Sequence, residues 1–147
     1  LLKQLNTLIE GETDEVTLLA NASALLNQFL EEINWVGFYI WKEGELVLGP
    51  FQGLPACTRI AYGKGVCGTA VKQRETIRVA DVTQFPGHIV CDAASQSEIV
   101  IPIIVNDSVY GVLDIDSPIT DRFDKTEQTY LEEFVKIIES QLVHIRE

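Results

Sequence analysis

The chain contains no methionine among its 147 residues, not even at position 1. We therefore expect the natural start of the chain to precede Leu1. No continuous apolar run approaches the roughly 20 residues that a membrane-spanning helix needs, and no signal-peptide pattern is visible. The sequence accordingly predicts no membrane association.

Basic residues and cysteines are also scarce. Eleven Lys and Arg stand against 22 Asp and Glu, which gives a formal net charge of -11 at pH 7. An acidic surface repels phosphate backbones and anionic lipids, so a nucleic-acid partner is not expected. Three cysteines are too few, and odd in number, for the disulfide framework of a small secreted protein. We expect a reducing, cytoplasmic location.

What is present is typical of one globular domain covering residues 1–147, with 46% hydrophobic and 22% charged residues. Residues 1–33 show a helical period that Gly11 to Asp14 interrupts, which predicts a short helix followed by a longer one. The predicted apolar face of this region consists of Val16, Leu19, Leu26, Phe29, Leu30 and Ile33. We expect this face to pack in the core; the alternative is a contact in a homodimer.

From Asn34 the period changes to two, which is typical of strands. Runs at 34–41, 46–51, 76–80, 99–105 and 109–116 are predicted strands, residues 66–74 a short helix, and the residues after Asp124 a last helix with Glu127 completing a capping box. The fold class is therefore α+β, an antiparallel sheet of about six strands with N- and C-terminal helices packed on it.

The first predicted strand has one aliphatic and one aromatic face. Trp35 and Tyr39 lie on the aromatic face together with Gly37. An aromatic face is more often core than pocket. Gly37 favours the pocket, because a glycine leaves room for a ligand to approach the backbone.

Asp114 and Asp116 are two residues apart on a predicted strand, so both side chains point to the same face while Ile115 faces the core. Two neighbouring carboxylates repel each other, and either the pKa of one rises until it holds a proton or the pair binds a cation. Glu98, at the start of the neighbouring strand, could join them. The alternative is a solvated strand end.

All three cysteines fall between residues 57 and 91, and three interpretations of them stay open. Cys57, Cys67, Cys91 and His88 could bind zinc, but the short CxxC knuckles of zinc modules are missing. The cysteines could be inert and buried, although Cys57 and Cys91 have polar, turn-forming neighbours. Redox chemistry, in which one thiolate attacks and a second thiol closes a disulfide, is the favoured interpretation, with no metal. His88 could support a thiolate or only hydrogen-bond within its loop.

Several motifs together resemble the free methionine-(R)-sulfoxide reductases, which are stand-alone GAF domains. They are the segments 34–39 (NWVGFY), 49–53 (GPFQG), 56–60 (ACTRI), 63–68 (GKGVCG), 85–92 (FPGHIVCD), 97–100 (SEIV) and 111–117 (GVLDIDS). The resemblance extends from about Asn34 to the C-terminus and includes the spacing of the cysteines.

The resemblance implies a GAF fold and an oxidoreductase that reduces free L-methionine-(R)-sulfoxide in defence against oxidative stress. It implies Cys91 as the nucleophile, Cys57 as the resolving thiol and Cys67 as an auxiliary or alternative thiol. The implied pocket residues are Trp35, Tyr39, Glu98, Asp114 and Asp116. No bound cofactor is implied, and thioredoxin, or dithiothreitol in vitro, is the expected reductant. The rival functions are a GAF sensory module that binds a small ligand without catalysis, and a structural dimerisation domain.

Overall fold

The computed structural model describes residues 1–87 and 94–146. In this part of the chain, six strands form one sheet in the order β3-β2-β1-β6-β5-β4, with every neighbouring pair antiparallel. The strands are β1 (Trp35–Lys42), β2 (Glu45–Gly53), β3 (Arg59–Ala61), β4 (Ile77–Val79), β5 (Ser97–Val105) and β6 (Ser108–Ser117). The helices are α1 (Leu2–Ile9), α2 (Glu15–Phe29), α3 (Gly65–Gln73) and α4 (Lys125–Arg146), with a short 3-10 helix, η1 (Val82–Gln84). The predicted α+β class is confirmed.

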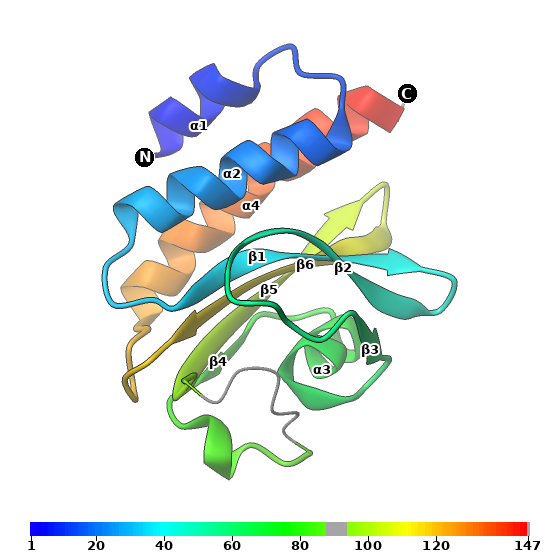
Figure 1. Ribbon diagram of the computed structural model, residues 1–147. Helices are drawn as coiled ribbons and strands as arrows, with labels where there is room; N and C mark the ends of the chain where they lie inside the picture. Colours follow the sequence, from blue (N-terminus) through cyan, green and yellow to red (C-terminus); the bar gives the residue numbers. More distant parts are fainter. Residues whose placement is uncertain (88–93, 147) are drawn as a thin grey trace.

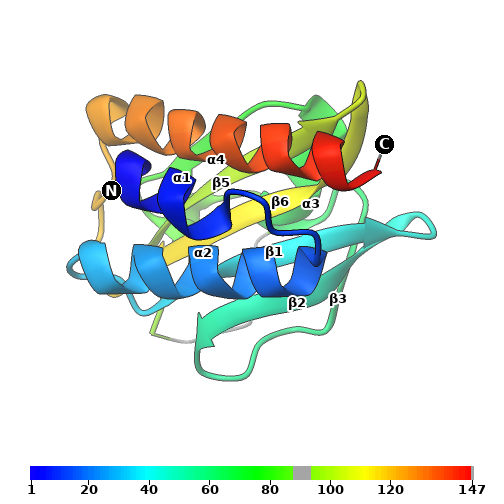
Figure 2. The same cartoon turned by 90° about the horizontal axis from the view of Figure 1, so that it is seen from above.

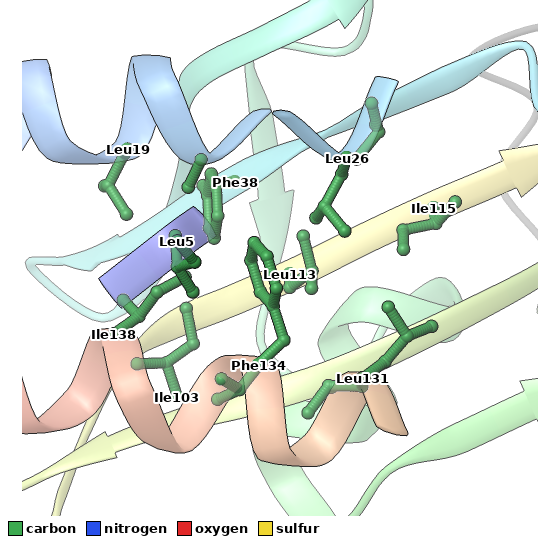
Figure 3. Packing of buried hydrophobic residues seen from close by; sticks show 14 of the residues in the cluster. Leu5, Leu19, Leu26, Phe38, Ile103, Leu113, Ile115, Leu131, Phe134 and Ile138 are labelled. Atoms are coloured by element: carbon green, nitrogen blue, oxygen red, sulfur yellow. The ribbon is translucent and has the colours of Figure 1, made fainter. Parts of the chain in front are cut away.

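Helices α1, α2 and α4 cover one face of the sheet (Figures 1 and 2). The aliphatic side chains that alternate along β1, β5 and β6 point toward them, because successive side chains of a strand face opposite sides. Phe38, Ile103 and Ile115 meet Leu26 and Phe134 there in a core that the solvent does not reach (Figure 3). This core joins the terminal helices to the central strands.

The buried stripe of α2 differs from the predicted one. Val16 is 66% exposed and Phe29 42% exposed, so their prediction as core residues was wrong. The residues that face the sheet are Leu18, Leu19, Ala22, Ser23 and Leu26. The reason is helical phase: Asp14 caps the helix by accepting a hydrogen bond from Thr17 N, and the face set by Leu18 and Leu19 excludes Val16. Core packing is confirmed for Leu19 and Leu26; a homodimer stays a prediction.

The capping box of α4 is only half formed. Asp124 Oδ1 accepts a hydrogen bond from Glu127 N at 2.7 Å, as predicted. The carboxylate of Glu127, however, accepts from Arg122 Nη1 at 2.6 Å. Arg122 also donates to the carbonyl of Glu31, and so ties the end of α2 to the start of α4.

The opposite face of the sheet carries a second, smaller core. Helix α3, which was predicted at 66–74, lies on this face, and β3 forms the edge of the sheet beside it (Figure 1). The sequence did not predict this three-residue strand. The core combines strand side chains that face away from the first core with side chains of α3 and η1: Trp35, Tyr39, Leu46, Ile60, Val66, Cys67, Ala70, Val71, Val79, Val82, Val100 and Val112. The predicted site residues gather on this side.

Candidate active site

Strand register places the predicted carboxylates in adjacent rows across β1, β6 and β5. Asp116 lies opposite Trp35 on one side and Glu98 on the other, and Asp114 lies opposite Gly37 and Val100. Directly opposite side chains in an antiparallel pair are about 5 Å apart and share a face. Ile115 packs into the helical core, so the two aspartates point to the α3 side. The sequence prediction that Glu98 joins the aspartate pair is therefore confirmed in position.

Burial decides the protonation of these acids. Asp114 is 5% exposed, which rejects the solvated strand end for this residue, whereas Asp116 is half-buried. Glu98 is 8% exposed. Burial is the largest cause that raises the pKa of Glu98 well above its usual value, and the charge of Asp114 adds to it. Burial and then the charge of Asp116 do the same to Asp114. These neighbours act as one titrating unit that retains protons well above the usual range of a carboxyl.

Helix α3 brings Cys67 to the same acids. Gly63 and Gly65 take positive φ angles of 73° and 61°, and the turn they form starts the helix. Gly68 lets α3 lie against β3, because a Cβ there would come within 2.4 Å of the carbonyl of Ala61. Cys67, in the first helical turn, is then directed at the sheet and is 4% exposed.

A thiol and two carboxyl groups thus form one buried cluster. One ligand atom each from Cys67, Glu98 and Asp114 lies within 4.8 Å of the other two. Burial first, and then the charge of Asp114, raises the pKa of Cys67 well above its usual value, so Cys67 stays a neutral thiol. The position of Cys67 at a helix N-terminus, which favours a thiolate, does not outweigh these effects. Sequence reasoning missed this contact, since no local pattern relates residue 67 to residue 114.

The same three groups are the donor set that could hold a cation in the described part of the chain. Sulfur and carboxylate oxygen together suit a borderline cation such as Zn²⁺, but binding would have to release the protons that the raised pKa values retain. The alternative zinc site of Cys57, Cys67, Cys91 and His88 is weakened, because Cys57 is disulfide-bonded and cannot act as a free thiolate ligand. Cys67 is a free thiol.

Trp35 and Tyr39 are both 2% exposed and line the face that carries the acids. The Trp35 and Tyr39 rings stack with centroids 5.9 Å apart, and the Phe51 ring also stacks with Trp35, with centroids 5.1 Å apart. The prediction that Gly37 leaves room for a ligand was wrong. A Cβ at Gly37 would lie 2.2 Å from Cβ of Phe51, so the space above this glycine is filled by β2.

Cys57 is half-buried on the segment between β2 and β3. Its carbonyl accepts a hydrogen bond from the Tyr39 hydroxyl at 2.8 Å, a contact that no sequence pattern indicated. Cys91 and His88 lie outside the described residues, so their roles and the Cys57–Cys91 disulfide remain predictions.

Within the residues that the structure describes, no helix combines the length and the apolar character needed to cross a membrane.

The chain is similar to known proteins over nearly its whole length. The family model described as GAF domain matches residues 5–142, so this is a GAF domain protein. The chain is 50% identical to the free methionine-R-sulfoxide reductase of Escherichia coli, over 95% of this chain and 85% of that protein. It belongs to the family of these reductases.

Two solved structures extend the similarity to three dimensions. The structure of fRMsr of Staphylococcus aureus in complex with substrate has a TM-score of 0.92 and 60% identity, over 96% of this chain and 92% of that one. The free methionine-R-sulfoxide reductase from Neisseria meningitidis in complex with its substrate has a TM-score of 0.93 and 44% identity, over 98% of this chain and 86% of that one.

Proposed function

We propose that this protein reduces free L-methionine-(R)-sulfoxide to methionine. The observation that carries the proposal is the pair of buried acids with raised pKa values, Glu98 and Asp114, on the sheet face that also presents Trp35. A sulfoxide sulfur becomes electrophilic when its oxygen is protonated, and an acid that holds its proton at neutral pH can supply that proton. The relatives named for this activity support the same conclusion.

The cluster also accounts for a preference for the free amino acid. The ammonium group of free methionine sulfoxide can pair with the half-buried Asp116, whereas a residue within a peptide has lost that charge. Trp35 offers an apolar ring surface for the methyl sulfoxide end. These roles of Trp35, Tyr39, Glu98, Asp114 and Asp116 are part of the proposal.

In the first redox step, the thiolate of Cys91 attacks the protonated sulfoxide. The oxygen leaves the substrate sulfur and ends on the Cys91 sulfur as a sulfenic acid, and methionine is released. The raised pKa of Cys67 supports its assignment as an auxiliary thiol, because a thiol that stays protonated is a poor nucleophile.

In the second step, the Cys57 thiol condenses with that sulfenic acid. The new sulfur–sulfur bond replaces the sulfur–oxygen bond, and water leaves. The disulfide-bonded state of Cys57 supports this role. A dithiol reductant, which we propose to be thioredoxin in a reducing cytoplasm, then restores both thiols without a bound cofactor.

The decisive assay incubates the purified protein with dithiothreitol and racemic free methionine sulfoxide, followed by chiral analysis of the remaining substrate. We expect loss of the R epimer alone. Loss of neither epimer would reject the reductase and favour the GAF sensory module.

The assignment of the nucleophile is tested with single substitutions. Cys91→Ser should abolish turnover, whereas Cys67→Ser should retain it. The reverse result, activity in Cys91→Ser and none in Cys67→Ser, would make Cys67 the nucleophile.

A further inference from the structure

Trp35 and Tyr39, the two aromatic residues expected to line the pocket, both donate hydrogen bonds to the backbone of the segment that carries Cys57. The Trp35 indole donates from Nε1 to the carbonyl of Leu54 at 3.1 Å. Four residues along the same strand face, the Tyr39 hydroxyl donates to the carbonyl of Cys57 at 2.8 Å. The segment after β2 is thus tied to β1 at two points, one of them the cysteine itself.

Tyr39 also faces the acid cluster. Burial, and next the charge of Asp114, raises the pKa of the Tyr39 hydroxyl above its usual range, with smaller effects of Cys67, Asp116 and Glu98. The hydroxyl therefore stays protonated over the whole working pH range and remains a hydrogen-bond donor. Tyr39 is thus influenced by the charges of the acids and donates to the Cys57 carbonyl through the same hydroxyl.

We propose that Tyr39 is a positioning residue for Cys57, whose hydroxyl holds this cysteine where disulfide closure occurs. The inference rests on the proposed function, in which Cys57 is the resolving thiol, and adds a second role to a residue expected only to bind substrate. The hydrogen bond is present while Cys57 is disulfide-bonded, which is the state that closure produces. A sulfur atom must approach its partner within a narrow geometry to form this bond.

The step concerned is the condensation of a thiol with a sulfenic acid. Hydrogen peroxide converts a thiolate to the same sulfenic acid, with hydroxide leaving, and so bypasses methionine sulfoxide. The reduced protein is therefore mixed with hydrogen peroxide in the absence of reductant. Disulfide closure is followed by loss of free thiols, and the sulfenic acid by trapping with dimedone and mass spectrometry.

Tyr39→Phe removes the hydroxyl and keeps the ring. We expect closure to be slower by roughly three- to tenfold, as the loss of one buried hydrogen bond implies, and the dimedone adduct to increase. Trp35→Phe, which removes the other donor, should act in the same direction. Tyr130→Phe, which removes a hydroxyl from the exposed face of α4 on the opposite side of the sheet, should close at the wild-type rate.

Closure at the wild-type rate in a folded Tyr39→Phe protein would overturn the inference, and so would a wild-type protein that forms no disulfide with Cys57. These outcomes are separate from failure of the proposed function. A protein that closes its disulfide after peroxide, with the expected effect of Tyr39→Phe, but consumes no methionine sulfoxide would reject the reductase activity and leave the positioning role of Tyr39 in place.

Discussion

Asp114 is a carboxylic acid that is buried in the protein interior, where its charged form is unfavourable. Its Oδ1 atom is buried and accepts no hydrogen bond from the described groups, and its neighbours are a thiol and two further acids. A buried carboxylate in such surroundings is costly, so the group is stable mainly in its neutral form. Under the proposed function, this neutral acid would be able to donate a proton to the substrate.

The pH profile of the reaction tests this arrangement. The rate constant kcat/KM should fall on the alkaline side as the acid unit loses its proton. In Asp114→Asn, the negative charge that raises the pKa of Glu98 is gone, so the alkaline limb should move to lower pH. Glu98→Gln should lower kcat/KM by about 100-fold or more, the usual effect of losing a general acid. An alkaline limb that stays in place in Asp114→Asn would show that the two acids do not titrate together.

Stability should depend on the same residue. Because the pKa of Asp114 is raised in the folded state, the folded protein binds more protons than the unfolded chain, and stability is lost as pH rises from about 4 toward the raised value. We expect Asp114→Asn to be more stable than the wild type, with a difference in unfolding free energy of about 1–3 kcal/mol that is larger at about pH 8 than at about pH 5.

Urea denaturation at both pH values, with the cysteines in the same redox state, measures that difference. Asp107→Asn is the matched control, because Asp107 lies at the fully exposed β5–β6 turn and its change should be nearly independent of pH. Equal effects of the two substitutions at both pH values would contradict a raised pKa at Asp114.

At the scale of elements, periodicity predicted most of the fold. The period of two in 34–41 and 109–116 correctly placed Trp35, Tyr39 and the two aspartates on one face, because strand geometry is local. The short strand β3 was missed, since three residues carry no measurable period. The face of α2 was misplaced because several adjacent residues are apolar, and only packing on the sheet decides which are buried.

The contacts between distant elements were predicted only in part: the position of Glu98 beside the two aspartates was predicted, but the contacts that a helix or a loop makes with the sheet were not. Cys67 with Asp114, and Tyr39 with Cys57, depend on how α3 and the segment after β2 settle on the sheet. Gly37 was misinterpreted for the same reason. A glycine in a strand indicates a close approach, but the sequence does not say whether a ligand or another strand approaches, and here it is Phe51.

Gly37→Ala tests this close packing of β1 and β2. The new Cβ would lie 2.7 Å from the Cα of Phe51, so the strands must separate, and we expect a loss of about 3 kcal/mol in unfolding free energy together with reduced activity. Gly11→Ala is the control: its φ is +76°, but nothing lies within 4 Å, so it should cost only about 1 kcal/mol and leave activity unchanged. Chemical denaturation and the methionine sulfoxide assay distinguish the two, and equal losses would contradict the steric explanation.

At the scale of the whole molecule, the outer edge of β5 is protected against pairing with another chain. Strand β4 pairs with β5 only from Glu98 to Val100, so the residues of β5 that follow Val100 do not pair with β4. On that stretch Pro102 has no N–H, and the N–H of Ile104 donates to Glu139 of α4 at 2.7 Å. An edge without available donors is a poor template for a further strand.

Removing this protection should promote association. We expect Glu139→Ala, and more strongly Glu139→Ala combined with Pro102→Val, to form oligomers that size-exclusion chromatography and light scattering detect. Glu133→Ala removes the same charge from an exposed position of the same helix and should elute like the wild type. Association of Glu133→Ala to the same extent would assign the effect to net charge and not to the strand edge.

The sheet has one further consequence. It separates a helix-covered core, which holds the chain together, from the thiol and acid cluster on its other side. The two cores have no buried side chain in common, so substitutions in one core can leave the packing of the other unchanged. A scaffold divided in this way can acquire new ligands by changing the α3 side alone, which makes this chain a practical starting point for engineering reductases with altered substrate preference.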